Sequence, residues 1–102
     1  MKIFRELVDE IKDELHGAKS YAKRATRYKT ENPTMAKMYY DMANDELKHT
    51  DMLHAEAVRA IEKQRAIETP PQYMLDRWDE EHAEYVEKAA KVKLMLQMFS
   101  GR

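Results

Sequence analysis

Three side chains in this sequence, Glu14, Glu46 and His49, are of the types that ligate metal ions. Glu46 and His49 form a Glu-x-x-His pair, and each of the three interrupts an otherwise apolar helical stripe. A carboxylate among apolar residues is costly unless a partner offsets its charge, and a metal ion is one such partner. A Glu from one helix with Glu-x-x-His from another is half the ligand set of a di-iron or di-manganese carboxylate bundle.

The elements that must position these residues are three long helices. The sequence is broken by two proline-containing segments, residues 30–33 and residues 69–72. Asn32 predicts the N-cap of a helix that opens with Pro33, and Thr69 predicts the N-cap of the next helix. We therefore expect helices over about residues 3–30, 33–67 and 71–99.

Each expected helix carries an apolar stripe with the alternating three- and four-residue spacing of one helix face. This pattern predicts an all-α fold in which the helices pack along their stripes. The first two stripes are interrupted near their middle by charged or titratable residues, and the third is interrupted by one histidine. The stripes are Phe4, Leu7, Ile11, Glu14, Ala18, Tyr21, Ala25 and Tyr28; Met35, Tyr39, Met42, Glu46, His49, Leu53, Ala57 and Ala60; and Leu75, Trp78, His82, Tyr85, Ala89, Val92, Leu96 and Phe99.

The turn between the first two helices places the three candidate ligands at one height. If these helices form an antiparallel hairpin that turns near residue 31, Glu14 lies 17 residues before the turn, and Glu46 and His49 lie 15 and 18 residues after it. A helix rises by about 1.5 Å per residue, so the three side chains stand at nearly the same level. Glu46 and His49 are also one helical turn apart and can face the same ion. The sequence thus predicts a metal site between the two helices.

The third helix is expected to offer no ligand at that level. If it folds back near residue 70, Val92 and its apolar stripe neighbours lie opposite the predicted site. His82 then lies about 15 Å away along the bundle, where it can approach His54 and Glu56 instead. We expect His82 to be a seam histidine or a contact between chains.

One chain therefore supplies two carboxylates and one imidazole, and a di-metal carboxylate centre uses twice that number. A second copy related by a two-fold axis would supply the other half, and C2 dimers are the commonest oligomers. We expect two hairpins to form a four-helix bundle with the metals at the dimer interface.

Iron, manganese and zinc suit these ligands. Tyr21, two turns from Glu14 on the same stripe, is a candidate catalytic residue near the oxidant.

Composition limits the other functions. The chain has 102 residues, a formal net charge of -1 and 0 Cys. The length predicts one domain over residues 1–102, with a modest core to which partner chains can add. The charge argues against nucleic acid and anionic membranes as partners, and the lack of cysteine excludes disulfides and thiolate metal sites. Because no segment approaches a signal peptide or a membrane span, we expect a cytoplasmic protein.

Two stretches of the chain carry a resemblance to the ferritin-like superfamily. They are Glu14-Leu15-His16-Gly17-Ala18-Lys19-Ser20-Tyr21 and Met42-Ala43-Asn44-Asp45-Glu46-Leu47-Lys48-His49. They look like halves of rubrerythrin and ferritin, and the single-hairpin format is most similar to encapsulated ferritins, in which two chains share a ferroxidase centre. The resemblance implies iron(II) oxidation at Glu14, Tyr21, Glu46 and His49 in a dimer or a ring of dimers. The C-terminal residues 96–102 show no clear tail that would target a compartment shell.

The same residues have a plainer interpretation. Glu14 alone could fix helix register as a polar residue in the seam, as such groups do in coiled coils. Glu46 and His49 could simply hydrogen-bond each other on a partly exposed face, and Glu-x-x-His is frequent by chance in a Glu-rich helix. The alternative function is then a structural or interaction module with the same fold and no metal chemistry, docking through the third helix.

Overall fold

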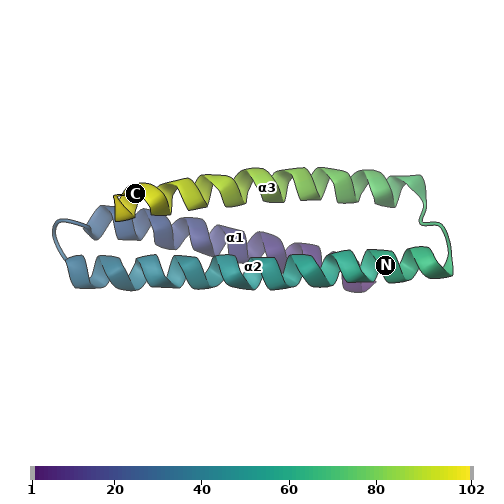
Figure 1. Ribbon diagram of the computed structural model, residues 1–102, viewed down its shortest axis with the longest axis horizontal. Helices are drawn as coiled ribbons and strands as arrows, with labels where there is room; N and C mark the ends of the chain where they lie inside the picture. The colour runs from purple at the N-terminus through teal and green to yellow at the C-terminus, as the bar shows by residue number, and fades with distance from the viewer. Residues whose placement is uncertain (1, 102) are drawn as a thin grey trace.

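A computed structural model of the chain describes residues 2–101, and within that range it contains three helices and no strand. Helix α1 spans Lys2–Tyr28, α2 spans Pro33–Ile67 and α3 spans Gln72–Ser100. Helices α1 and α2 form an antiparallel hairpin, and α3 turns back beside it so that it runs in the same direction as α1 (Figure 1). The predictions of an all-α fold and of an α1–α2 hairpin are confirmed.

The first turn follows its sequence signal, and the second does not. The side chain of Asn32 caps α2 by accepting a hydrogen bond from the backbone amide of Met35 at 3.2 Å. Helix α3 begins only after Pro71 and has no side-chain cap, so the prediction that Thr69 is its N-cap is wrong. The physical reason is the pair of prolines, because a residue that precedes a proline is held extended, and this keeps both Thr69 and Pro70 out of the helix.

Small side chains allow α1 and α2 to lie close together. Six alanines, three from each helix, are at most 1% exposed. Alanine combines the highest helix propensity with the shortest side chain that a helix interior favours, so the two backbones can approach without loss of helicity. This contact sets the relative height of residues on α1 and α2. The alanines are Ala18, Ala22, Ala25, Ala36, Ala43 and Ala57.

Helix α3 covers one side of this hairpin. Its buried residues Ala89, Val92 and Leu96 pack into the main core, together with Leu15 of α1 and Leu47 of α2. It packs more closely against α1 than against α2. The resulting rod measures 55 × 18 × 17 Å, and its radius of gyration of 16.2 Å exceeds the value of about 13 Å expected for a compact domain of this length. A three-helix rod of this shape leaves the other side of the hairpin uncovered.

The core of α1 takes in part of the predicted stripe and residues beside it. Four of the eight stripe residues are buried, whereas Glu14 and Tyr21 are only partly buried. Leu15 and Ala22, which lie outside the stripe, are buried as well. Because α3 packs on one side of the hairpin, the buried face of α1 is wider than the predicted stripe and extends toward α3.

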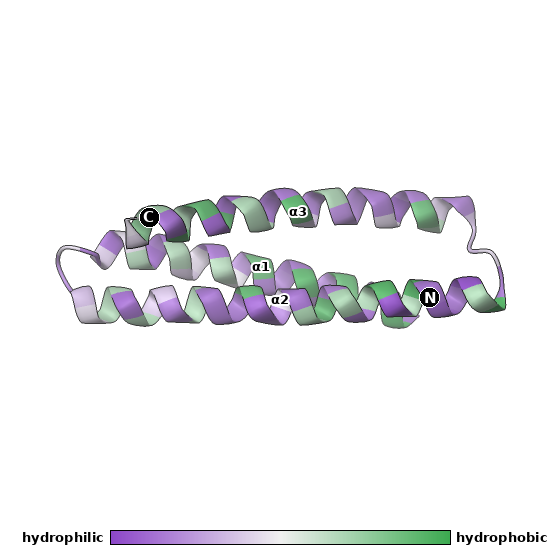
Figure 2. Ribbon diagram, in the orientation of Figure 1, coloured by the Kyte–Doolittle hydropathy of each residue, from purple (hydrophilic) through white to green (hydrophobic). Residues whose placement is uncertain are grey.

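The amphipathic pattern is strongest in α1 and weaker in α2 and α3. Hydrophilic and hydrophobic residues are interspersed along all three ribbons (Figure 2), as expected for helices that bury one face. Within the part of the chain that the structure describes, no helix has a stretch both long enough and apolar enough to cross a membrane.

The packing of α3 predicts a contrast between two leucines on that helix. Leu96 is 5% exposed in the core, and Leu94, two residues earlier, is 56% exposed. We expect Leu96→Ala to lower the free energy of unfolding by about 2–4 kcal/mol, because it removes buried methyl groups and leaves a cavity. Leu94→Ala should change it by less than about 0.5 kcal/mol. Urea unfolding followed by circular dichroism measures both, and equal effects would contradict the position of α3.

Candidate metal centre

The hairpin brings Glu14, Glu46 and His49 together. One potential ligand atom from each residue lies within 4.8 Å of the other two. His49 Nδ1 is 3.5 Å from Glu14 Oε2. At this level α3 presents Val92, which is buried in the core. The predictions that the three residues share one height, and that α3 offers an apolar side chain there, are both confirmed.

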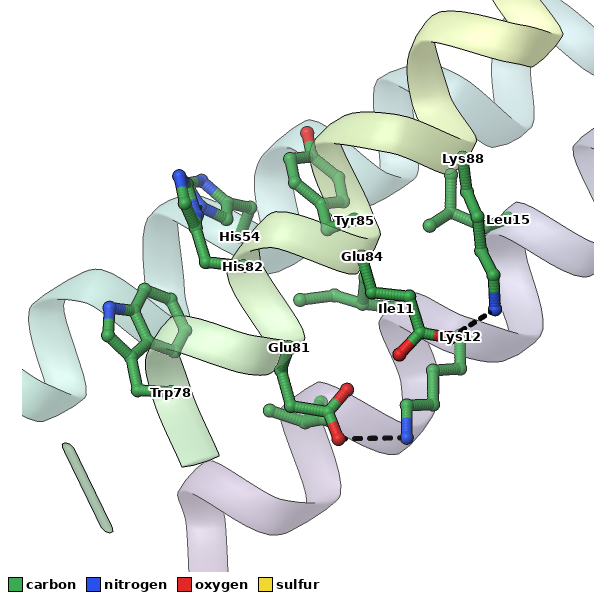
Figure 3. A pocket seen from close by; sticks show the side chains of 11 residues that line it. Ile11, Lys12, Leu15, His54, Trp78, Glu81, His82, Glu84, Tyr85 and Lys88 are labelled. Carbon is green, nitrogen blue, oxygen red and sulfur yellow. Dashed lines mark hydrogen bonds and ion pairs between the residues drawn. The ribbon is translucent and has the colours of Figure 1, made fainter. Parts of the chain in front are cut away.

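These three residues lie on the side of the hairpin away from α3. Successive side chains are rotated by about 100° around a helix, so Glu14 and Lys12 point about 160° apart on α1. Lys12 reaches α3, where its Nζ pairs with Glu81 at 3.0 Å (Figure 3). On α2, Asp51 accepts a hydrogen bond from a tyrosine of α3, and Glu46 points about 140° away from Asp51. The site therefore faces the uncovered side of the bundle.

One carboxylate oxygen of Glu14 is buried without a hydrogen-bond partner. This atom is Oε2, the oxygen that lies nearest to His49. The Glu14 side chain as a whole is 29% exposed and that of His49 is 54% exposed, so the group can be reached from solvent. A buried carboxylate oxygen with no donor is unfavourable, and a proton or a cation placed between the acidic side chains relieves it.

The carboxyl group of Glu14 affects the ionisation of Glu46. The pKa of Glu46 is raised to about 7, chiefly because hydrogen bonding with Glu14 stabilises the protonated carboxyl. Burial and the negative charge of Glu14 act in the same direction, and the nearby His49 imidazole opposes them. Two carboxylates this close resist ionising together. Because metal ligands bind in their deprotonated form, a divalent cation can take the place of the proton.

Gly17 and Thr50 shape the site, and sequence reasoning assigned neither of them a role there. A Cβ atom at Gly17 would lie 3.3 Å from Glu46 Oε2, so the missing side chain leaves room for the Glu46 carboxylate. The available signal was the spacing, since Gly17 stands three residues after Glu14 and faces the same way. Thr50 is 1% exposed, and its hydroxyl donates to the backbone carbonyl of Glu46 at 2.8 Å. This hydrogen bond ties Thr50 to the helical turn that carries both Glu46 and His49.

Tyr21 does not join the three ligands. Its ring stacks on Tyr39 with the ring centres 6.0 Å apart, and Tyr39 stacks in turn on Tyr28 at 6.3 Å. The guanidinium of Arg24 lies 5.8 Å from the ring centre of Tyr21 and 5.6 Å from that of Tyr39. Two helical turns, a rise of about 10 Å, separate Tyr21 from Glu14. A catalytic role for Tyr21 stays a prediction.

The comparisons with known proteins found no match among family models, curated proteins or solved structures, so the site is interpreted from its own geometry. The resemblance to ferritin-like proteins therefore stays a prediction that rests on residues 14–21 and 42–49.

The raised pKa of Glu46 predicts how stability depends on pH in the metal-free protein. Between the ordinary value of 4.5 and the folded value of about 7, the folded chain holds a proton that the unfolded chain releases. The stabilisation is complete below pH 4.5 and is lost as the pH rises through 7, because stability falls where the folded state binds more protons. We expect Glu46→Gln, which cannot ionise, to show a smaller decrease in melting temperature between pH 5 and pH 8.

The matched control is Glu62→Gln, a change of the same kind at an exposed position of the same helix. Its melting temperature should decrease between pH 5 and pH 8 by as much as that of the wild type. Thermal unfolding in a metal-chelating buffer measures all three proteins. Parallel curves for the wild type and Glu46→Gln would show that the two carboxyl groups do not interact.

Proposed function

We propose that this chain binds iron through Glu14, Glu46 and His49, and that two copies together form a di-iron centre that oxidises Fe(II) with dioxygen or peroxide. The observation that carries the proposal is the convergence of one potential ligand atom from each residue within 4.8 Å of the other two. In addition, Glu14 has a buried carboxylate oxygen with no hydrogen-bond partner. The resemblance of residues 14–21 and 42–49 to ferritin-like proteins supports the same chemistry.

The donor set suits iron. Carboxylate oxygens and an imidazole nitrogen bind iron and manganese, and less selectively zinc. Glu14 and Glu46 would offset the charge of closely spaced cations, and His49 would add a neutral nitrogen ligand. Bound Fe(II) supplies the electrons that reduce the oxidant. The chain's own contribution is to hold two carboxylates and an imidazole at one height on the hairpin.

The second copy is proposed because the donor set of one chain is half of what a di-metal carboxylate centre uses. The three ligands face the side of the hairpin that α3 leaves uncovered. Large apolar side chains are also exposed elsewhere on α1 and α2, with Ile3 63%, Met38 47% and Met52 69% exposed. A second hairpin packed against the uncovered side would complete a four-helix bundle. A dimer, or a ring of dimers, is therefore the proposed assembly.

Anaerobic addition of Fe(II) followed by air tests the proposal. We expect the wild type to take up about one iron per chain, since each chain supplies half of a two-metal ligand set, and to develop near-ultraviolet absorbance as the iron is oxidised. Glu46→Ala should lose both the uptake and the rapid oxidation. Glu62→Ala, an exposed change on the same helix, should retain them.

Two further readouts bear on the same proposal. Binding to the native state must raise its stability, so anaerobic Fe(II) should raise the melting temperature of the wild type and not that of Glu46→Ala. Light scattering should show a dimer or a multiple of it. No iron uptake and an unchanged melting temperature would contradict the proposal and favour the alternative, a structural or interaction module without metal chemistry.

The space at Gly17 allows metal binding to be separated from folding. In Gly17→Ala the new methyl group would meet Glu46 Oε2 at 3.3 Å and displace that carboxylate by a few tenths of an ångström. Alanine also favours the helix by about 1 kcal/mol over glycine. We expect the metal-free variant to be at least as stable as the wild type while it binds Fe(II) more weakly. Calorimetry and anaerobic titration measure the two effects, and unchanged Fe(II) affinity would contradict the role of Gly17.

A further inference from the structure

A second group of metal-binding side chains lies between α2 and α3, on the opposite side of the hairpin from the first site. His54 of α2 and His82 of α3 lie next to each other (Figure 3), and His54 Nε2 is 3.0 Å from His82 Nδ1. The expectation that His82 approaches His54 is confirmed. Glu56, the other residue expected near His82, pairs with Arg59 instead.

Aromatic neighbours hold the His54 ring in place. It stacks on Tyr85 with the ring centres 4.7 Å apart and the planes 8° from parallel, and Trp78 lies at 5.8 Å. The hydroxyl of Tyr85 donates to Asp51 Oδ1 at 2.8 Å. These contacts fix the direction of the imidazole, as partners of metal-bound histidines do in established sites.

The short distance between the two ring nitrogens requires a positive charge or a proton between them. Two imidazole lone pairs repel at this separation, so either one ring donates a hydrogen bond or both bind one cation. In a tetrahedral zinc site, two nitrogens at about 2.0–2.1 Å from the ion lie roughly 3.3–3.4 Å apart, so the 3.0 Å observed would have to widen by a few tenths of an ångström for both rings to bind it. Burial and the neighbouring His82 also lower the pKa of His54, and this favours the neutral imidazole that metals bind.

A carboxylate lies one helical turn from His54, and it would have to turn toward the histidines to bind the same ion. Among the described residues, Glu14, Glu46 and His49 are the group whose three potential ligand atoms already lie within 4.8 Å of one another. Asp51 precedes His54 by one helical turn, so the two side chains share a face of α2. One carboxylate oxygen of Asp51 is occupied by Tyr85, and the negative charge of Asp51 also acts on His54. His82 is exposed, which leaves room for water ligands. The arrangement repeats on α2 the acid-x-x-His spacing of Glu46 and His49, with a histidine from α3 in place of the second carboxylate.

We propose that His54 and His82 form a second metal site that takes a transition-metal ion of the zinc class, with Asp51 as a carboxylate that can turn to complete it. Two imidazoles and one carboxylate are a nitrogen-rich set, which suits Zn²⁺, whereas the carboxylate-rich set around Glu14 suits iron. The proposal is independent of the proposed function, because the two sites share no residue.

The ion would join α2 to α3. These two helices have fewer backbone contacts with each other than either has with α1. A metal that binds side chains of both helices therefore stabilises the docked position of α3, by an amount that grows with the free metal concentration.

The test is a Zn²⁺ titration of the full chain carrying Glu14→Gln and Glu46→Gln, so that the first site does not compete. We expect this protein to bind one Zn²⁺ and to melt at a higher temperature with the ion present. Adding His82→Ala should weaken Zn²⁺ binding by at least about tenfold and abolish the rise in melting temperature. His16→Ala, a change at an exposed histidine on α1, should alter neither.

Nitrogen-15 spectra of the histidine rings provide a second measurement, which does not require the His82→Ala variant to fold. Zn²⁺ should shift His54 Nε2 and His82 Nδ1, and leave the ring nitrogens of His16 unchanged. If these two signals do not move, or if His82→Ala binds Zn²⁺ as well as its parent, the pair is a hydrogen bond alone and the proposal is overturned. Failure of Zn²⁺ binding here would leave iron binding at Glu14 unaffected.

Discussion

The close contact between α1 and α2 is the constraint on which the rest of the structure depends. Alanines from both helices lie in this contact almost without exposure to solvent, among them Ala18 and Ala43. Because short side chains interlock at one register, a residue on α1 has a fixed neighbour on α2. That register brings Glu14 level with Glu46 and His49, although they are far apart along the chain. A shift of one helical turn, about 5.4 Å, would separate them.

The placement of α3 gives the two sides of the hairpin different chemistry. On one side α3 supplies Val92 and Leu96 to the core and His82 to the pair with His54. On the other side no helix of the described chain covers the carboxylates, so they stay partly exposed. The proposed second chain at Glu14 and the proposed second metal at His54 both follow from this one-sided coverage.

The carboxylate pair is held against its own repulsion. Protonation of Glu46 relieves it, and hydrogen bonding with Glu14 accordingly raises the pKa of Glu46 to about 7. The absence of a side chain at Gly17 leaves room for the Glu46 carboxylate. A rigid backbone that tolerates this local cost is typical of functional sites, where favourable packing elsewhere stabilises an arrangement that would not form alone.

The sequence by itself determined the three helices, the hairpin and the common level of the three candidate ligands, because helix rise and breaker positions are local properties. It also placed His82 near His54. Tertiary packing decided what depends on the direction from which a neighbour approaches. It widened the buried face of α1 to include Leu15, delayed α3 until after Pro71, and gave Gly17 its place beside Glu46. Helical spacing specifies a face of a helix, but only the position of α3 selects which face is buried.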